Sequence, residues 1–199
     1  MSVLRRWILA VSVVLLAVLT LSACSSDEPD HGAGAHHGDA DLPTGVNRAD
    51  VMFTTMMIPH HEQAIEMSDV LLAKDEIDPD VASLAERIKQ AQGPEIEQMQ
   101  QWLDDWDTGM DGGMGDGMGD GHGAGMMGED DLVALEQAEG EAASRLFLRQ
   151  MIEHHEGAIE MARDEVADGR SPDVVGLAGS IVATQTLEIE QMNELLKSL

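Results

Sequence analysis

Apolar residues recur at helical spacing along four segments that make up most of the chain after residue 45. Each segment is rich in Glu, Gln, Ala, Leu and Met, which favour helices. Asp78-Pro79 and Ser171-Pro172 each place a good N-cap before a proline suited to the first helical position. The pattern therefore predicts helices over about 47–76, 79–106, 131–168 and 172–198.

The second half of this region repeats the first. Residues 57–67 (MIPHHEQAIEM) and 151–161 (MIEHHEGAIEM) match at nine of eleven positions, and residues 92–99 and 185–192 match at six of eight. Each copy holds two helices with an apolar stripe to bury. The sequence thus predicts an all-α four-helix bundle over 45–199, built from two duplicated helical hairpins.

Prolines break the symmetry of the copies. Pro59 precedes the first histidine pair, and Gly93-Pro94 precedes Glu95, whereas the second copy has no proline at either place. We expect Pro59 to bend its helix and Gly93-Pro94 to interrupt the next one, with tolerated kinks that have no role as the alternative.

Helical projection places polar, metal-binding residue types on the apolar faces. One arc, roughly 120° wide, holds both histidines of each copy together with methionine. These residues are Met57, His60, His61 and Met67 in the first copy and Met151, His154, His155 and Met161 in the second. On the following helices the apolar stripes contain Gln92, Glu95 and Met99, and Gln185, Glu188 and Met192. In each hairpin these polar residues lie at nearly equal distances, along the two helices, from the turn that joins them. We therefore expect them to form one polar layer at the same height in all four helices.

Buried imidazoles and carboxylates must satisfy one another or hold a ligand, because unpartnered polar groups are costly in a core. Thioether and imidazole suit copper, with Cu(I) favoured, and Glu95 and Glu188 then accept hydrogen bonds from the histidines. Iron or zinc bound through those carboxylates is the alternative, and a layer that only sets helix register is another. No nucleophile–base constellation is present, so we expect no enzyme.

The N-terminus is typical of an export signal. Arg5 and Arg6 precede an apolar run of 13 residues, too short for a comfortable membrane span. Leu21-Ser22-Ala23-Cys24 resembles the lipobox of bacterial lipoproteins and contains the only cysteine. We expect a signal peptide over 1–23 and a lipid on Cys24 that anchors the chain to the outer face of the cell membrane. An uncleaved anchor is the alternative.

Two segments have little to bury and are predicted to be disordered. The tether over 24–44 contains His31, His36 and His37, and is either a spacer or a metal-collecting arm. The linker over 107–130 is mostly Gly, Met and Asp, and is either a connector or an arm that captures a soft cation. Its methionines are Met110, Met114, Met118, Met126 and Met127.

The net charge of the chain limits the kinds of partner that it can bind. There are 11 Lys and Arg against 38 Asp and Glu, for a formal net charge of −27. Such a surface repels nucleic acid and anionic lipid headgroups and attracts metal cations. The oligomeric state does not follow from the sequence.

The two motifs resemble the bacterial family called domain of unknown function 305. Its pattern is Met-[Ile/Val]-x-His-His-x-x-Ala-Ile-x-Met, followed one helix later by Gln-x-x-Glu-Ile-x-x-Met, and both occur twice here. The resemblance implies a ferritin-like four-helix bundle. Some members, the CopM-type extracytoplasmic proteins, bind copper and are linked to copper resistance. It therefore implies copper at the two His/Met sets named above.

Overall fold

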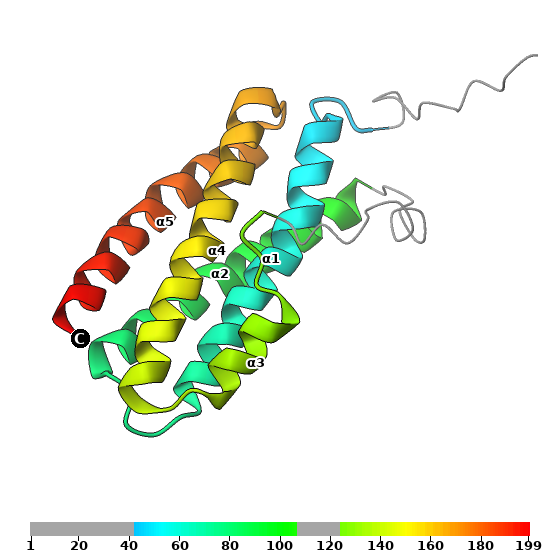
Figure 1. Cartoon of the computed structure of the whole chain (residues 1–199). Coiled ribbons are helices and arrows are strands. Elements are labelled where there is room, and N and C mark those ends of the chain that lie inside the picture. The colour runs from blue at the N-terminus through cyan, green and yellow to red at the C-terminus, as the bar shows by residue number, and fades with distance from the viewer. Residues whose placement is uncertain (1–41, 107–123) are drawn as a thin grey trace, which may run out of the picture. The chain divides into compact units, whose positions relative to one another are not determined.

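The computed structural model describes residues 42–106 and 124–199. Within these ranges the chain is all-helical and has no strand, which confirms the predicted fold class. The five helices of these ranges are α1 (Arg48–Leu72), α2 (Pro79–Asp105), α3 (Glu129–Gln137), α4 (Gly140–Asp168) and α5 (Pro172–Ser198) (Figure 1). Among the helices of these two ranges, none is both long and apolar enough to cross a membrane.

The helices are arranged as two hairpins, as the duplication predicts. α1 packs along α2, and α4 packs along α5. α1 also packs on α4, so these two helices form the centre of the bundle, whereas α2 and α5 barely touch each other. The short α3 lies across α1 and α4 (Figure 1).

Both predicted N-caps are present at the hairpin turns. The Asp78 carboxylate accepts hydrogen bonds from the backbone N–H groups of Asp80 and Val81, at 2.9 and 3.2 Å. The Ser171 hydroxyl accepts one from Val174 at 3.5 Å. These bonds satisfy backbone donors that have no partner within the first turn of a helix, and so fix where α2 and α5 begin.

The prediction of a single helix over 131–168 is wrong. The chain leaves helical geometry at Ala138 and Glu139, which are extended, and Gly140 has a φ of +53°. Glycine adopts this left-handed conformation without steric cost. The break lets α3 fold back over the central helices, where Leu135 is completely buried.

The predicted interruption at Gly93-Pro94 is also wrong. α2 continues through Pro94, and α1 continues through Pro59. Each proline removes one backbone donor, but helices in folded proteins are held mainly by the packing of their apolar face. Both long helices therefore survive the loss.

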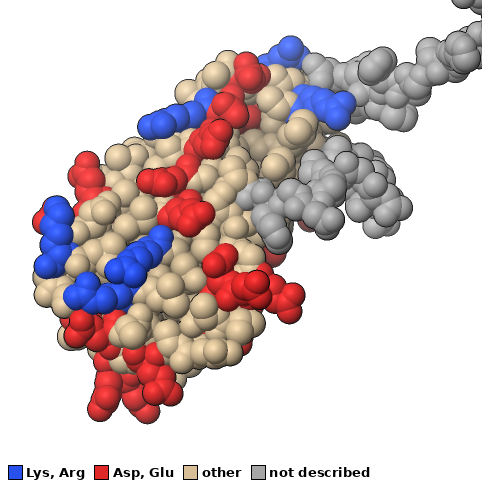
Figure 2. Space-filling view, viewed as in Figure 1, with Lys and Arg blue, Asp and Glu red and all other residues tan. Residues whose placement is uncertain are grey.

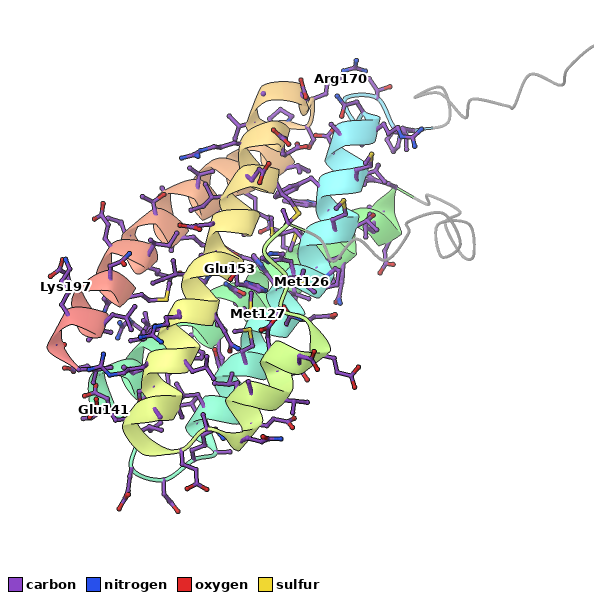
Figure 3. The ribbon with its side chains drawn as sticks, viewed as in Figure 1. Met126, Met127, Glu141, Glu153, Arg170 and Lys197 are labelled. Atoms are coloured by element: carbon purple, nitrogen blue, oxygen red, sulfur yellow. The ribbon has the colours of Figure 1, made fainter. Side chains whose placement is uncertain are left out.

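Each hairpin turn is anchored by the central helix of the other hairpin. Asp50, in the first turn of α1, accepts hydrogen bonds through Oδ1 from the N–H groups of Arg170 and Ser171, at 3.0 and 2.9 Å. Figure 3 shows Arg170 at this turn, beside the start of α1. Ser144 holds the equivalent position in α4, and its hydroxyl accepts from the N–H of Asp78 at 3.0 Å. The two hairpins are thus tied together at both ends of the bundle.

The apolar core falls into two clusters on either side of the middle of α1 and α4. One cluster includes Ala64, Met67, Leu71, Leu84, Ile88, Phe147, Met151 and Met192. The other includes Phe53, Met57, Met99, Ala158, Ala162 and Ile181. The histidine pairs of the repeated motif lie in the sequence between these groups.

The surface of the bundle is acidic. The face in Figure 2 carries more Asp and Glu than Lys and Arg. Several of the basic side chains are paired, as in the ion pairs of Arg145 with Glu141 at 3.0 Å and of Lys197 with Glu194 at 2.7 Å. The net negative charge counted from the sequence therefore lies, at least on this face, on the surface of the folded bundle.

Some sequence predictions concern residues outside the described ranges. They are the signal peptide over 1–23, Cys24, the tether histidines, and Met110, Met114 and Met118 of the linker. These stay predictions.

One buried carboxyl occupies a core position. Glu165 in α4 is 2% exposed and is equivalent to Leu71 of α1, given the 94-residue offset between the motifs. Burial raises the pKa of Glu165 to about 8, together with a hydrogen bond to the Asp50 carboxyl and the negative charges of Asp50 and Asp168. The neutral acid is the form that this position favours.

We expect the contribution of Glu165 to the stability of the bundle to fall as pH rises from about 5 to about 8. In this window the folded state keeps a proton on Glu165 that the unfolded chain has lost, so raising the pH favours unfolding. The loss in the free energy of unfolding is roughly 1.4 kcal/mol for each unit by which the pKa of Glu165 in the folded state exceeds its pKa in the unfolded chain. The difference in the free energy of unfolding between the wild type and Glu165→Gln, measured with urea across this pH range, isolates this contribution.

Glu165→Gln should remove this part of the pH dependence, because an amide does not titrate. Asp164→Asn, at the exposed neighbouring position, should keep the wild-type profile. Superimposable profiles for Glu165→Gln and the wild type would contradict the assignment.

Candidate metal centre

All four motif histidines are buried in the middle of the bundle, as helical projection predicts. None has more than 1% of its surface exposed. Because α1 and α4 are copies of one unit, His60 meets its own counterpart, His154, where the helices pack. Their ring centroids lie 3.8 Å apart at an interplanar angle of 44°. We call His60 and His154 the central pair.

The outer two histidines are each bonded to a glutamate on the neighbouring helix. His61 Nε2 lies 2.8 Å from Glu95 Oε2, and His155 Nε2 lies 2.8 Å from Glu188 Oε2. The two glutamate side chains are 23% and 15% exposed. The predicted equal height of these groups is confirmed, and the two copies of the motif form the same hydrogen bond.

The acceptors fix the ring protons. A carboxylate or a carbonyl oxygen only accepts, so the nitrogen facing it carries the hydrogen. This applies to Nε2 of His61 and His155, and also to Nε2 of His60, which donates to the carbonyl oxygen of Ala124 at 3.1 Å. In the neutral form of each ring, Nδ1 then carries a lone pair.

These lone pairs are buried and have no partner among the described residues. Nδ1 of His60, His61 and His155 has no hydrogen-bond partner of good geometry there, and neither ring nitrogen of His154, one of which carries a hydrogen, has one either. Leaving such groups unpaired costs about 1–3 kcal/mol each. A bound cation would satisfy the lone pairs, although not the N–H of His154.

The central pair is held in the neutral form. Burial lowers the pKa of His60 to about 4, although the hydrogen bond to Ala124 acts in the opposite direction. Burial and the neighbouring imidazoles lower the pKa of His154 still further. Neutral imidazole is the form that coordinates metal ions, so no proton has to be displaced from the ring lone pairs at neutral pH.

Most of the predicted methionines are buried on both sides of this histidine layer. Met57, Met67, Met99, Met151 and Met192 are completely buried, and Met161 is partly buried. Met57 belongs to one apolar cluster and Met151 to the other. One turn of helix separates each of them from the following histidine pair, so a thioether approaches the layer from each side.

The glutamines of the layer are buried as predicted. Gln92 and Gln185 are each 3% exposed, and neither side-chain oxygen has a partner among the described residues. Among the described residues there is no group of three or more His, Cys, Asp or Glu side chains that could hold a metal ion. The ligand roles of Gln92, Glu95, Met99, Gln185, Glu188 and Met192 stay predictions, as do those of the motif residues.

The sequence analysis missed a segment that crosses the central helices. We call residues 124–128 the strap. Met127 is 5% exposed, and its backbone N–H and C=O pair with the side chain of Gln63 at 2.7 and 3.0 Å. Figure 3 shows Met126 and Met127 on the strap beside Glu153 of α4. The prediction of disorder is therefore wrong for this end of the linker.

A signal for the strap was present in the sequence. Gln63 and Gly157 occupy one of only two positions at which the eleven-residue motifs differ. Both residues contact the strap, Gln63 by hydrogen bonds and Gly157 by close backbone approach. A glutamine in one copy and a glycine at the equivalent position of the other indicate a segment that contacts the two copies in different ways.

Comparison with known proteins identifies the relatives of the chain. The family model "Domain of unknown function (DUF305)" matches residues 50–196. No curated protein matched. A DUF305 fragment from Deinococcus radiodurans is similar in structure, with 32% identity, a TM-score of 0.68, and coverage of 77% of this chain and 99% of the fragment.

Two further solved structures are similar over the same region. A DUF305 protein from Streptomyces coelicolor has 32% identity and a TM-score of 0.65, covering 75% of this chain and 93% of its own. CopM in a Cu(II)-bound form has 33% identity and a TM-score of 0.62, covering 75% of this chain and 96% of its own. CopM also crystallised in Cu(I)-bound and silver-bound forms.

Removing either glutamate of the layer should destabilise the bundle. Glu95→Ala and Glu188→Ala each leave a buried imidazole N–H without its acceptor, which costs about 1–3 kcal/mol in the free energy of unfolding. Exposed Glu97→Ala and Glu190→Ala are matched controls on the same helices and should stay within about 0.5 kcal/mol of the wild type. Urea unfolding near neutral pH measures all four. Equal stabilities would show that His61 and His155 do not depend on these acceptors.

Proposed function

The chain belongs to the family of domain of unknown function 305, and from this premise we propose that it binds copper through its histidine layer. One observation carries the proposal: the Nδ1 atoms of the four buried histidines have no hydrogen-bond partner of good geometry among the described residues. The relative CopM was crystallised with Cu(I), Cu(II) and silver. The chemistry of the layer is suited to the same ions.

The donor types favour Cu(I) over iron or zinc. Thioether sulfur and neutral imidazole are soft to borderline ligands, whereas carboxylates suit harder cations. Glu95 and Glu188 already accept hydrogen bonds from His61 and His155. They are therefore best suited to orient the rings and keep the Nδ1 lone pairs free.

We assign the ion to the central pair with help from neighbouring thioethers. His60 and His154 lie closest to each other and come from different hairpins, so one ion between them would join the two halves of the bundle. Met57 and Met151 are the nearest methionines in the sequence. A d¹⁰ Cu(I) ion needs few ligands, which two imidazoles and a thioether supply. The ion is cargo to be buffered, and we propose no catalytic role.

The proposed setting is the outer face of the cell membrane. The signal-like N-terminus and Cys24 support export and lipid anchoring, and the acidic surface of the bundle raises the local concentration of cations. We propose that the protein lowers the free copper concentration there and so contributes to copper resistance. The methionines of the linker would add weak, exchangeable binding.

Removal of the central pair should abolish tight Cu(I) binding. In His60→Phe with His154→Phe, rings of similar size replace the imidazoles, so the affinity for Cu(I) should fall by about 100-fold or more, equivalent to roughly 2.7 kcal/mol. Competition against a Cu(I)-specific chelator under anaerobic conditions measures it.

The tether provides the control, since His36→Ala with His37→Ala should leave this affinity unchanged. Unaltered Cu(I) binding in the phenylalanine variant would move the site elsewhere. Iron in the protein as purified, lost in Glu95→Ala, would favour the carboxylate–histidine alternative. Thermal stability that is indifferent to copper, zinc and iron would favour a purely structural layer.

Substitution of Cys24 tests the proposed lipid anchor. Fractionation of cells that express the full chain is expected to place the wild type with the membranes. Cys24→Ala removes the sulfur that would carry the lipid, so uncleaved precursor should accumulate and lipid labelling should be lost. Lipid labelling that persists in Cys24→Ala would contradict the proposed anchor.

A further inference from the structure

The duplicated motifs are not used symmetrically. The pseudo-equivalent histidines of the central pair differ in their surroundings, because only one linker joins the two hairpins. His60 Nε2 donates to the Ala124 carbonyl, whereas neither ring nitrogen of His154 has a partner of good geometry among the described residues. The strap is what makes these two rings different.

Gln63 fixes the strap to α1. Its side-chain amide makes two reciprocal hydrogen bonds with the backbone of Met127, one donated at 3.0 Å and one accepted at 2.7 Å. Gln63 is 9% exposed, so water competes weakly for these bonds. The residue at the equivalent position of the second copy has no side chain and cannot make such a clamp.

Gly157 provides the space on α4. A Cβ atom at this position would collide with the backbone carbonyl of Ala124, and one at Gly125 would collide with the backbone of Glu153. Gly125 also has a φ of +76°, which favours glycine. A clash with backbone atoms cannot be relieved by a change of rotamer, as a clash with a flexible side chain can. The strap can therefore pack this closely on α4 only because both positions are glycine.

The two contacts together determine where the Ala124 carbonyl points. Gln63 holds the strap three residues further along, and Gly157 lets it descend onto α4, so that the carbonyl oxygen comes within 3.1 Å of His60 Nε2. A backbone carbonyl that accepts from one ring nitrogen of a histidine is a common way to orient a metal ligand.

We propose that Gln63 is a positioning residue, which clamps the strap so that the Ala124 carbonyl holds the His60 Nε2 proton and the strap covers the central pair. His60 then presents Nδ1 to the ion, and the ion leaves only when the strap lifts. The part that concerns the ion rests on the proposed function. The part that concerns the strap and the ring proton does not.

Two substitutions displace the strap from opposite sides. Gln63→Leu keeps the size of the side chain but removes both hydrogen bonds to Met127. Gly157→Ala inserts a methyl group under Ala124, although alanine itself favours the helix. The control is Gln150→Leu: Gln150 of α4 donates to the Asp131 carbonyl of α3 at 2.7 Å, so its loss loosens α3 without touching the clamp.

The first readout is hydrogen exchange of the imidazole Nε2 protons, followed by NMR on the metal-free full chain. In the wild type these protons should be protected in His60, His61 and His155. In Gln63→Leu and Gly157→Ala the His60 proton should exchange about 10-fold faster or more, as expected for the loss of two hydrogen bonds. The protons bonded to the glutamates should keep their protection and so report that the bundle is intact.

The second readout uses Cu(I) as the probe. The rate at which bound Cu(I) passes to a competing chelator should rise about 10-fold in both strap variants and stay at the wild-type value in Gln150→Leu. A His60 proton that stays fully protected in both strap variants would overturn the proposal. Faster proton exchange with unchanged Cu(I) release would overturn the covering role. A wild-type protein that binds no Cu(I) but shows the predicted proton exchange would reject the proposed function and leave the clamp standing.

Discussion

Four imidazoles buried in a helical core are the constraint on which this structure depends. Each ring brings a donor and an acceptor into a region without water, and unsatisfied groups there are expensive. The helices are placed to meet that need: Glu95 and Glu188 reach His61 and His155 at 2.8 Å, and α1 and α4 bring His60 against His154. The apolar clusters on either side keep water from these groups. The lone pairs that remain are the reason to infer a cation.

Duplication explains how the layer is built, and departures from symmetry explain what it can do. Asp50 and Ser144 occupy equivalent positions, and each anchors the turn of the opposite hairpin. A pair of copies related in this way brings equivalent histidines together without requiring separate evolution of two ligand sets. The strap then breaks the equivalence, because a single linker serves two copies.

The sequence predicts the features that depend on helical period. Burial of His60, His61, His154 and His155, and the partnership of the outer pair with glutamates, follow from projection and from equal distances to the turns. The break before Gly140 was missed because the residues on either side of it favour a helix, and only tertiary contacts reward the fold-back of α3. The strap was missed because a composition of Gly, Met and Asp has no period, although the difference between Gln63 and Gly157 pointed to it.

X-ray absorption spectroscopy at the copper edge, on the full chain loaded with Cu(I), tests the central claim most directly. The account predicts imidazole nitrogen and thioether sulfur together as ligands, because these are the donors that the buried layer offers. It also predicts that the nitrogen contribution drops in the protein that carries His60→Phe and His154→Phe. A shell made of oxygen ligands, or a wild-type spectrum from that double variant, would contradict the account.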